Sequence, residues 1–198
     1  MNSDGRKRPG KTGQAGAKKR VVRRRLIEIS IAERLQSHLL ANLASRLAAE
    51  QIKSGMKKPE FAEHIGMSGS QFRYVRRHVG NPSILMLATA AARLKISLYE
   101  LLEGEPLGKR KNPSGEKMVQ NIGVVVEKRH RLSGMTKVDF AKMINVSVPQ
   151  LYLITDGVSN PPLLTTVEIA RRLDLTLWEL LGVEPIRKSE DSRPAPKA

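Results

Sequence analysis

The sequence predicts an all-α protein that contains two copies of one small helical domain. Residues 42–106, moved forward by 79 positions, align without a gap on residues 121–185, and 23 of the 65 aligned pairs are identical. A self-match of this length without insertions indicates a duplicated domain, since loops accept insertions more readily than packed elements. Aromatic residues make up only 4% of the chain, and β-branched runs are short, which argues against a sheet. We refer to residues 42–106 and 121–185 as the first and second copy.

Composition divides the chain into five segments. Residues 1–21 are rich in Gly, Lys and Arg and have few apolar residues, so we expect a disordered basic arm. The first domain is expected over 22–106, a linker over 107–116, the second domain over 117–185 and a disordered polar tail over 186–198. The first domain has an extra N-terminal helix that the second lacks. One interpretation is that this helix is a dimerisation or docking element. The alternative is that it covers the hydrophobic core of the first domain as a lid.

Within each copy the spacing of apolar residues predicts five helices. The first should end at a left-handed glycine, Gly55 or Gly134, and that of the second copy should start near Lys117. Serine or threonine should cap the third and last helices, at Ser68, Ser97, Ser147 and Thr176. The second, third and fourth helices are expected over about residues 58–65, 69–77 and 84–94, and over 137–144, 148–155 and 163–173. Asn-Pro pairs at 81–82 and 160–161 should interrupt the helical path.

Positive charge is concentrated in the first part of the chain. Of the formal net charge of +16, residues 1–41 carry +8 and the first copy +3, whereas the second copy is neutral. The block Arg23, Arg24 and Arg25 is typical of a solvated arm that follows a polyanion. A tail that only increases solubility is the alternative.

Several function classes are disfavoured by composition. The chain has no cysteine, which excludes disulfides and Cys-type zinc sites and fits a reducing cytoplasm. The four histidines are scattered without metal-ligand spacing, and no glycine-rich phosphate loop is present. We therefore expect no enzyme, no cofactor and no metal. The longest apolar run, 84–92, is far shorter than the roughly 18 residues of a membrane span, so we expect no membrane partner.

The second and third helices of each copy share one pattern: an aromatic–alanine pair, a turn, an N-cap serine and two apolar anchors. The pattern consists of Phe61-Ala62, Gly66, Ser68, Phe72 and Val75 in the first copy and of Phe140-Ala141, Asn145, Ser147, Leu151 and Ile154 in the second. Together with the Asn-Pro pairs and the closing Leu-Leu segments, it resembles the helix-turn-helix of the Cro and phage-repressor (XRE) family over about 130 residues. The resemblance implies two tandem five-helix, repressor-like helix-turn-helix domains. It also implies a DNA-binding transcriptional regulator of bacterial or phage origin, acting in the cytoplasm at the nucleoid.

The resemblance also implies which residues would contact double-stranded DNA. Base contacts would fall on Ser70, Gln71, Arg73 and Tyr74 in the first copy and on Gln150 and Tyr152 in the second. Phosphate contacts would fall on Lys58 and Lys137, and the basic residues Arg76, Arg77 and Arg23 to Arg25 suit the same role. Gln pairs bidentately with adenine and Arg with guanine. The family commonly has glycine where this chain has His78, so we expect His78 in a left-handed conformation.

The two predicted recognition helices differ in character. That of the second copy has no basic residue, and its apolar Val148 and Leu153 are candidates for protein contact. The first copy is therefore predicted to be the main DNA reader, with a homodimer or a partner regulator as a further partner. The alternative is a protein-interaction module, an antiactivator or co-regulator with only non-specific nucleic-acid binding. RNA binding through the arm is a third, weaker hypothesis, because the sheet and aromatic platforms that are common in RNA-binding modules are missing.

The connector between the copies sets how far apart they can bind. About 14 residues separate Pro106 from Asn121, and they span at most about 46 Å when extended. Half-sites one helical turn apart on DNA are about 34–36 Å from centre to centre. One chain can therefore occupy two adjacent half-sites.

Overall fold

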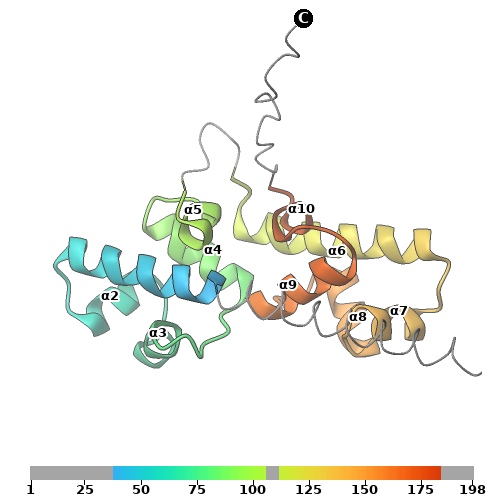
Figure 1. The fold of residues 1–198 in the computed structure, drawn as a ribbon, viewed down its shortest axis with the longest axis horizontal. Helices are drawn as coiled ribbons and strands as arrows, with labels where there is room; N and C mark the ends of the chain where they lie inside the picture. The colour runs from blue at the N-terminus through green and yellow to red at the C-terminus, as the bar shows by residue number, and fades with distance from the viewer. Residues whose placement is uncertain (1–37, 106–111, 184–198) are drawn as a thin grey trace, which may run out of the picture. The chain divides into compact units, whose positions relative to one another are not determined.

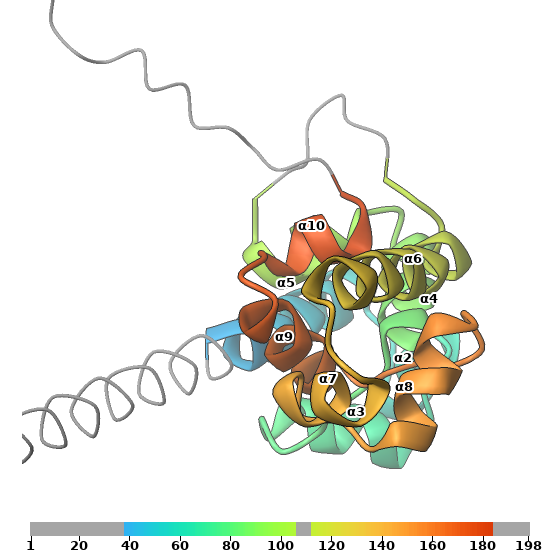
Figure 2. The same cartoon turned by 90° about the vertical axis from the view of Figure 1, so that its right-hand side faces the viewer.

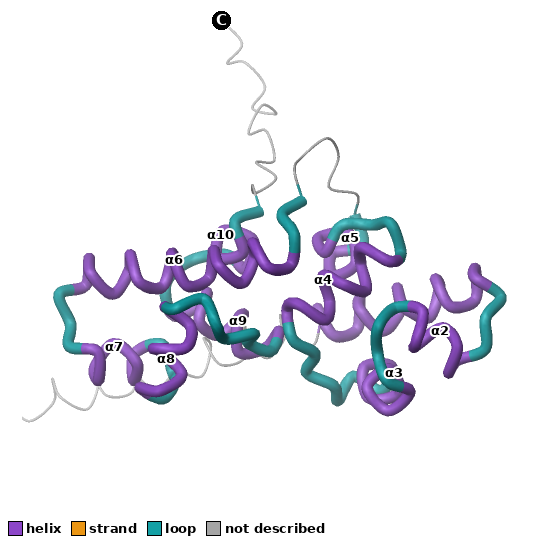
Figure 3. The backbone as a smooth tube through the Cα atoms, turned by 180° about the vertical axis from the view of Figure 1, so that it is seen from behind, coloured by secondary structure: helices purple, strands orange, loops and turns teal. Residues whose placement is uncertain are grey.

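The computed structural model describes residues 38–105 and 112–183, all of which belong to one compact unit over residues 36–198. Within these ranges the secondary structure consists of helices, apart from an isolated antiparallel bridge between Ser83 and Pro162 (Figure 1). Figure 3, coloured by secondary structure, accordingly contains only helices and loops in the described residues. The predicted all-α class is confirmed for this part of the chain.

The helices recur at an interval of 79 residues. The first copy contains a helix through residues 38–54, followed by α2 (Lys58–His64), α3 (Gly69–Arg76), α4 (Ile84–Arg93) and α5 (Leu98–Glu103). The second contains α6 (Gly115–Ser133), α7 (Lys137–Met143), α8 (Val148–Thr155), α9 (Leu163–Arg172) and α10 (Leu177–Leu181). From α2 and α7 to α4 and α9, every first and last residue differs by this interval. The duplication seen in the sequence is therefore also a duplication of helices.

The caps that begin and end these helices agree with the predicted positions. The hydroxyls of Ser68, Ser147, Ser97 and Thr176 each accept a hydrogen bond from the third residue of the helix that follows. Gly55 and Gly134 have φ of 68° and 64°, the left-handed conformation expected after the first helix of each copy. The start of α6, expected near Lys117, lies two residues earlier at Gly115, because Ser114 caps the helix by accepting from the Lys117 amide.

The core is formed by the inward faces of these helices. The aromatic residue of each predicted pattern, Phe61 and Phe140, has no exposed surface. Arg93 and Arg172, at the ends of α4 and α9, donate to carbonyl oxygens at the ends of α2 and α7. Because these carbonyls have no partner within their own helices, the two arginines hold the ends of α2 and α7, where the turns to α3 and α8 begin, in place.

Several predictions concern residues outside the described ranges. They are the basic arm 1–21, the extra helix as far as residue 37, residues 106–111 of the connector and the tail from residue 184. They stay predictions. In the described residues, no helix is both long and apolar enough to cross a membrane.

Candidate nucleic-acid interface

Helix α3 is anchored on α2 through its apolar underside. The rings of Phe61 and Phe72 meet nearly edge to face with centroids 5.6 Å apart, a favoured aromatic geometry. Val75 is buried one turn further along, and Ala62 is buried on α2. The four residues predicted to anchor the two helices are therefore all in the core, which leaves the opposite side of α3 exposed.

A short turn sets the position of α3 relative to α2. The amide of Met67 donates to the carbonyl of Ala62 at 2.8 Å, and Gly66 has φ of 78°. In the second copy the amide of Val146 donates to Ala141 at 3.0 Å, with Asn145 at φ of 60°. Both turns thus have the same hydrogen bond and a left-handed residue at the same place.

The exposed face of α3 carries the residues predicted to contact bases. Ser70, Gln71, Arg73 and Tyr74 are all exposed, the last with 49% of its surface. The guanidinium carbon of Arg73 lies 5.7 Å from the centre of the Tyr74 ring. This distance is within the range of a cation–π interaction, so the Arg73 side chain is supported rather than freely extended.

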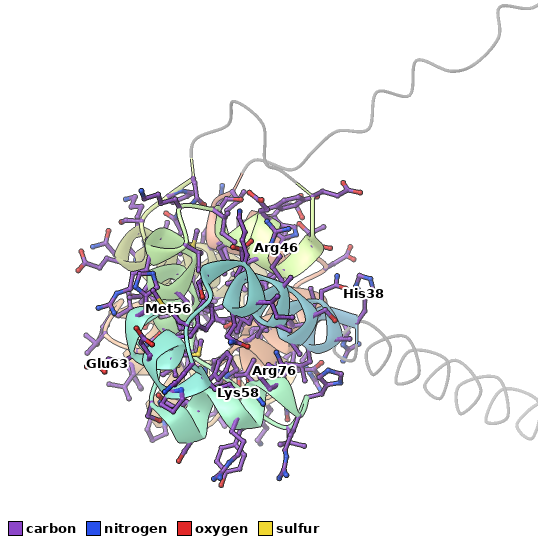
Figure 4. The ribbon with its side chains drawn as sticks, turned by 90° about the vertical axis from the view of Figure 1, so that its left-hand side faces the viewer. His38, Arg46, Met56, Lys58, Glu63 and Arg76 are labelled. Atoms are coloured by element: carbon purple, nitrogen blue, oxygen red, sulfur yellow. The ribbon has the colours of Figure 1, made fainter. Side chains whose placement is uncertain are left out.

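A hollow of about 450 Å³ lies beside this face, between the start of α2 and the side of α3, from Gly69 to the C-cap residue Arg77. We call it the basic hollow, and it is lined by Lys58, Pro59, Gly69, Phe72, Arg73, Arg76 and Arg77. Lys58 and Arg76 lie close together in Figure 4, where both are labelled. Four of the seven lining residues are cations and none is acidic. An anion placed here would accept charge-assisted hydrogen bonds from several side chains.

The second copy has a different surface at the same positions. Tyr152 replaces Arg73, and the ammonium of Lys137 lies 4.1 Å from the centre of its ring. Thr155 and the exposed Asp156 replace the other two arginines of the hollow. The equivalents of the four cations of the basic hollow are therefore one lysine, two uncharged residues and one aspartate.

The apolar residues predicted for protein contact differ in exposure. Leu153 and Tyr152 expose 49% and 45% of their surfaces. Val148 is only half-buried and packs against the core, so it contributes less to the surface than the sequence suggests. The exposed apolar face of α8 is thus centred on Leu153 and Tyr152.

Both predicted glutamine contacts are already engaged at the helix starts. The side-chain oxygens of Gln71 and Gln150 accept from the amides of Ser68 and Ser147 at 2.8 and 3.0 Å, and complete a capping box in each copy. A bidentate pair with adenine needs this oxygen as an acceptor. Either glutamine would therefore share the oxygen or leave its cap on binding.

Three carboxylates of the second copy hold local partners. Hydrogen bonds from Arg171 and then Arg172 lower the pKa of Glu168, and a hydrogen bond from Arg131 lowers the pKa of Glu127. The backbone amide of Thr176 likewise lowers the pKa of Glu179. Three arginines of the second copy are thus paired with carboxylates of the same copy, so their positive charges are compensated locally.

Two pairs of residues with a clear role were not identified as such from the sequence. Arg93 and Arg172 cap the ends of α2 and α7, and Asn81 and Asn160 bond across to the opposite copy. Each pair is identical in both copies. That identity at polar positions is the signal that could have revealed them.

Some of the predicted contact residues cannot be placed in this surface. Arg23, Arg24 and Arg25 lie outside the described residues.

Among the described residues, no group of three or more His, Cys, Asp or Glu side chains is arranged to hold a metal ion. Comparison of the chain with protein-family models, with curated proteins and with solved structures gave no match.

Proposed function

We propose that the chain is a transcriptional regulator that binds double-stranded DNA through two tandem helix-turn-helix domains, with α3 as the principal recognition helix. The observation that carries the proposal is the basic hollow beside the exposed face of α3. Such a regulator would act in the cytoplasm at the nucleoid of a bacterium.

The exposed side of α3 suits a DNA groove in size and chemistry. The major groove is about 12 Å wide and admits one α-helix. With Phe72 and Val75 buried beneath it, α3 is free to enter with Ser70 and Arg73 toward the base edges. Arg73 would pair with guanine N7 and O6, and a good bidentate pair contributes about 1–3 kcal/mol of discrimination.

The cations of the basic hollow suit the phosphate groups beside the groove. The basic hollow is lined by Lys58 of α2 and by Arg76 and Arg77 at the end of α3. These three cations would contact the DNA backbone while Arg73 contacts a base. Phosphate contacts position a protein on DNA but do not select the sequence. Lys137 would make the equivalent contact in the second copy, and Arg23 to Arg25 would add further phosphate contacts.

In-vitro selection of DNA sites, followed by binding titrations over a range of salt concentrations, tests the proposal. Arg73→Ala with Arg76→Ala should weaken binding to the selected site at least about tenfold, given the energy of a guanine pair. The matched control is Lys117→Ala with Lys128→Ala, which removes the same charge from exposed positions of α6. Equal effects of the two variants, or none, would refute α3 as the recognition helix.

A second candidate function is protein binding through α8. The exposed Leu153 and Tyr152 favour it, together with Val158, which exposes 72% of its surface. In this case the chain would be an antiactivator or co-regulator, and the basic residues would give only non-specific attraction to nucleic acid. A stable complex with another regulator that is lost on Tyr152→Arg, with no DNA sequence selected over random DNA, would favour this candidate.

A further inference from the structure

Four hydrogen bonds between the two copies form two reciprocal pairs. At the start of α4, the amide of Ile84 donates to the carbonyl of Pro161 at 3.1 Å, and at the start of α9 the amide of Leu163 donates to Pro82 at 2.9 Å. The next amide of each helix donates to an asparagine of the opposite copy: Leu85 to Asn160 Oδ1 at 3.1 Å, and Leu164 to Asn81 Oδ1 at 3.0 Å. Each copy therefore caps a helix of the other.

The two backbone hydrogen bonds flank Ser83 and Pro162 and form the isolated bridge between these residues, which hold the same position in the two copies. One further contact also joins equivalent residues: Tyr99 packs on Trp178 with ring centroids 4.8 Å apart. Both pairs are separated by 79 residues. Under two-fold symmetry a residue meets its own equivalent only near the axis. The contacts thus define a local two-fold relation between the copies, and the packing of α4 against α6 belongs to the same interface (Figure 2).

This interface is of the self-complementary kind that joins identical subunits, but it contains two bonds that only unlike copies make. The indole nitrogen of Trp178 donates to Glu103 at 3.0 Å, and the equivalent of Glu103 in the second copy is Gly182. The Asn160 amide donates to Ser83 Oγ at 2.9 Å, and Pro162 replaces this hydroxyl in the second copy. The first copy is thus matched to the second rather than to itself.

We infer that one chain is a complete two-fold DNA-binding unit whose partner is a single duplex site of two inverted and unequal halves. This inference rests on the proposed function. The two-fold relation applies equally to α3 and α8, so the half-sites that they contact must run in opposite directions. The surface that would join two chains in this way is already occupied within one chain.

The two halves of the site should differ in base composition. On α3 the exposed Arg73 favours guanine. On α8 its equivalent is Tyr152, followed by the exposed Leu153, and apolar side chains contact the methyl group of thymine. One half of the site is therefore expected to contain a required guanine and the other to be richer in A·T pairs.

The experiment has three parts, all with the full chain. Sedimentation should give the mass of one chain, 22.0 kDa, at all concentrations, and one chain per duplex. Site selection should return two inverted, unequal blocks. Inserting 5 base pairs between them, about half a helical turn, should weaken binding at least about tenfold, because the copies cannot rotate apart. Inserting 10 pairs is the companion measurement and should also weaken binding.

Each contrary result has a distinct meaning. A dimer in solution, a site with one block or two equal blocks, or binding that tolerates both insertions would overturn this inference and leave the proposed function standing. Selection of no DNA sequence at all would overturn both. A monomer bound to two unequal inverted blocks at fixed spacing would establish it.

Discussion

The rings of Tyr99 and Trp178 pack at a centroid distance of 4.8 Å, although the two residues lie 79 positions apart and occupy the same place in the two copies. The indole nitrogen of Trp178 also donates to Glu103. Trp178 therefore combines apolar packing between the copies with a hydrogen bond that only unlike copies make. Substitution of Trp178 is therefore a direct test of the pairing between the two copies.

Trp178→Ala should reduce the free energy of unfolding by about 3–5 kcal/mol, the usual cost of removing a buried large aromatic side chain. Trp178→Phe keeps a ring against Tyr99 but removes the bond to Glu103, so it should cost less, about 1–2 kcal/mol. Urea unfolding followed by circular dichroism measures both. Equal losses for the two variants would show that the contact with Tyr99 contributes little.

The asparagine caps should each contribute a measurable part of the stability. Asn81→Ala leaves the Leu164 amide without its acceptor, and Pro162, the N-cap residue of α9, offers no side-chain replacement. Loss of an N-cap costs about 1 kcal/mol, and we expect this value for Asn81→Ala and for Asn160→Ala. Gln120→Ala, at an exposed position of α6, is the control and should change stability by less than about 0.5 kcal/mol. Asparagine variants as stable as that control would contradict the capping role.

The helix positions could be predicted because most helices begin at a side-chain cap that is visible in the sequence. Ser68 and Ser147 precede apolar residues at helical spacing, and both cap as expected. The left-handed conformation expected at His78 is also present, with φ of 60°. The pairing of the copies could not be predicted, because Asn81 bonds to an amide 83 residues away. From the sequence, an Asn-Pro pair indicates only an interruption of the chain.

Part of the candidate site was equally predictable. The exposure of Arg73 and the burial of Phe72 follow from helical periodicity, and both are confirmed. The engagement of Gln71 was missed, although Ser followed three residues later by Gln is itself a capping-box pattern. The basic hollow needs the close approach of two helices, so no pattern along α3 alone could predict that Lys58 and Arg76 line one space.

Stability should fall at acidic pH, in part through Glu168. Hydrogen bonds from Arg171 and Arg172 hold its pKa below the ordinary value of 4.5 in the folded chain. The contribution is therefore fully present above about pH 4.5 and is lost as the pH falls through the folded pKa. The difference in unfolding free energy between the wild type and Glu168→Gln should shrink over that range. Glu63→Gln, at an exposed position, is the control, and a difference independent of pH would contradict this role.

The difference in positive charge between the exposed faces of α3 and α8 can be reduced by one substitution in α8. Tyr152 holds the place of Arg73, and its ring lies 4.1 Å from the ammonium of Lys137. Tyr152→Arg removes this contact and adds a second cation, so non-specific DNA binding should strengthen and its salt dependence should steepen by about one phosphate contact. Tyr152→Phe keeps an aromatic ring beside Lys137 and should leave the salt dependence unchanged. Fluorescence anisotropy with a random duplex over a range of salt concentrations measures both variants. If Tyr152→Arg leaves DNA binding unchanged but abolishes binding to a protein partner, then α8 contacts protein, and α3 alone would account for DNA recognition.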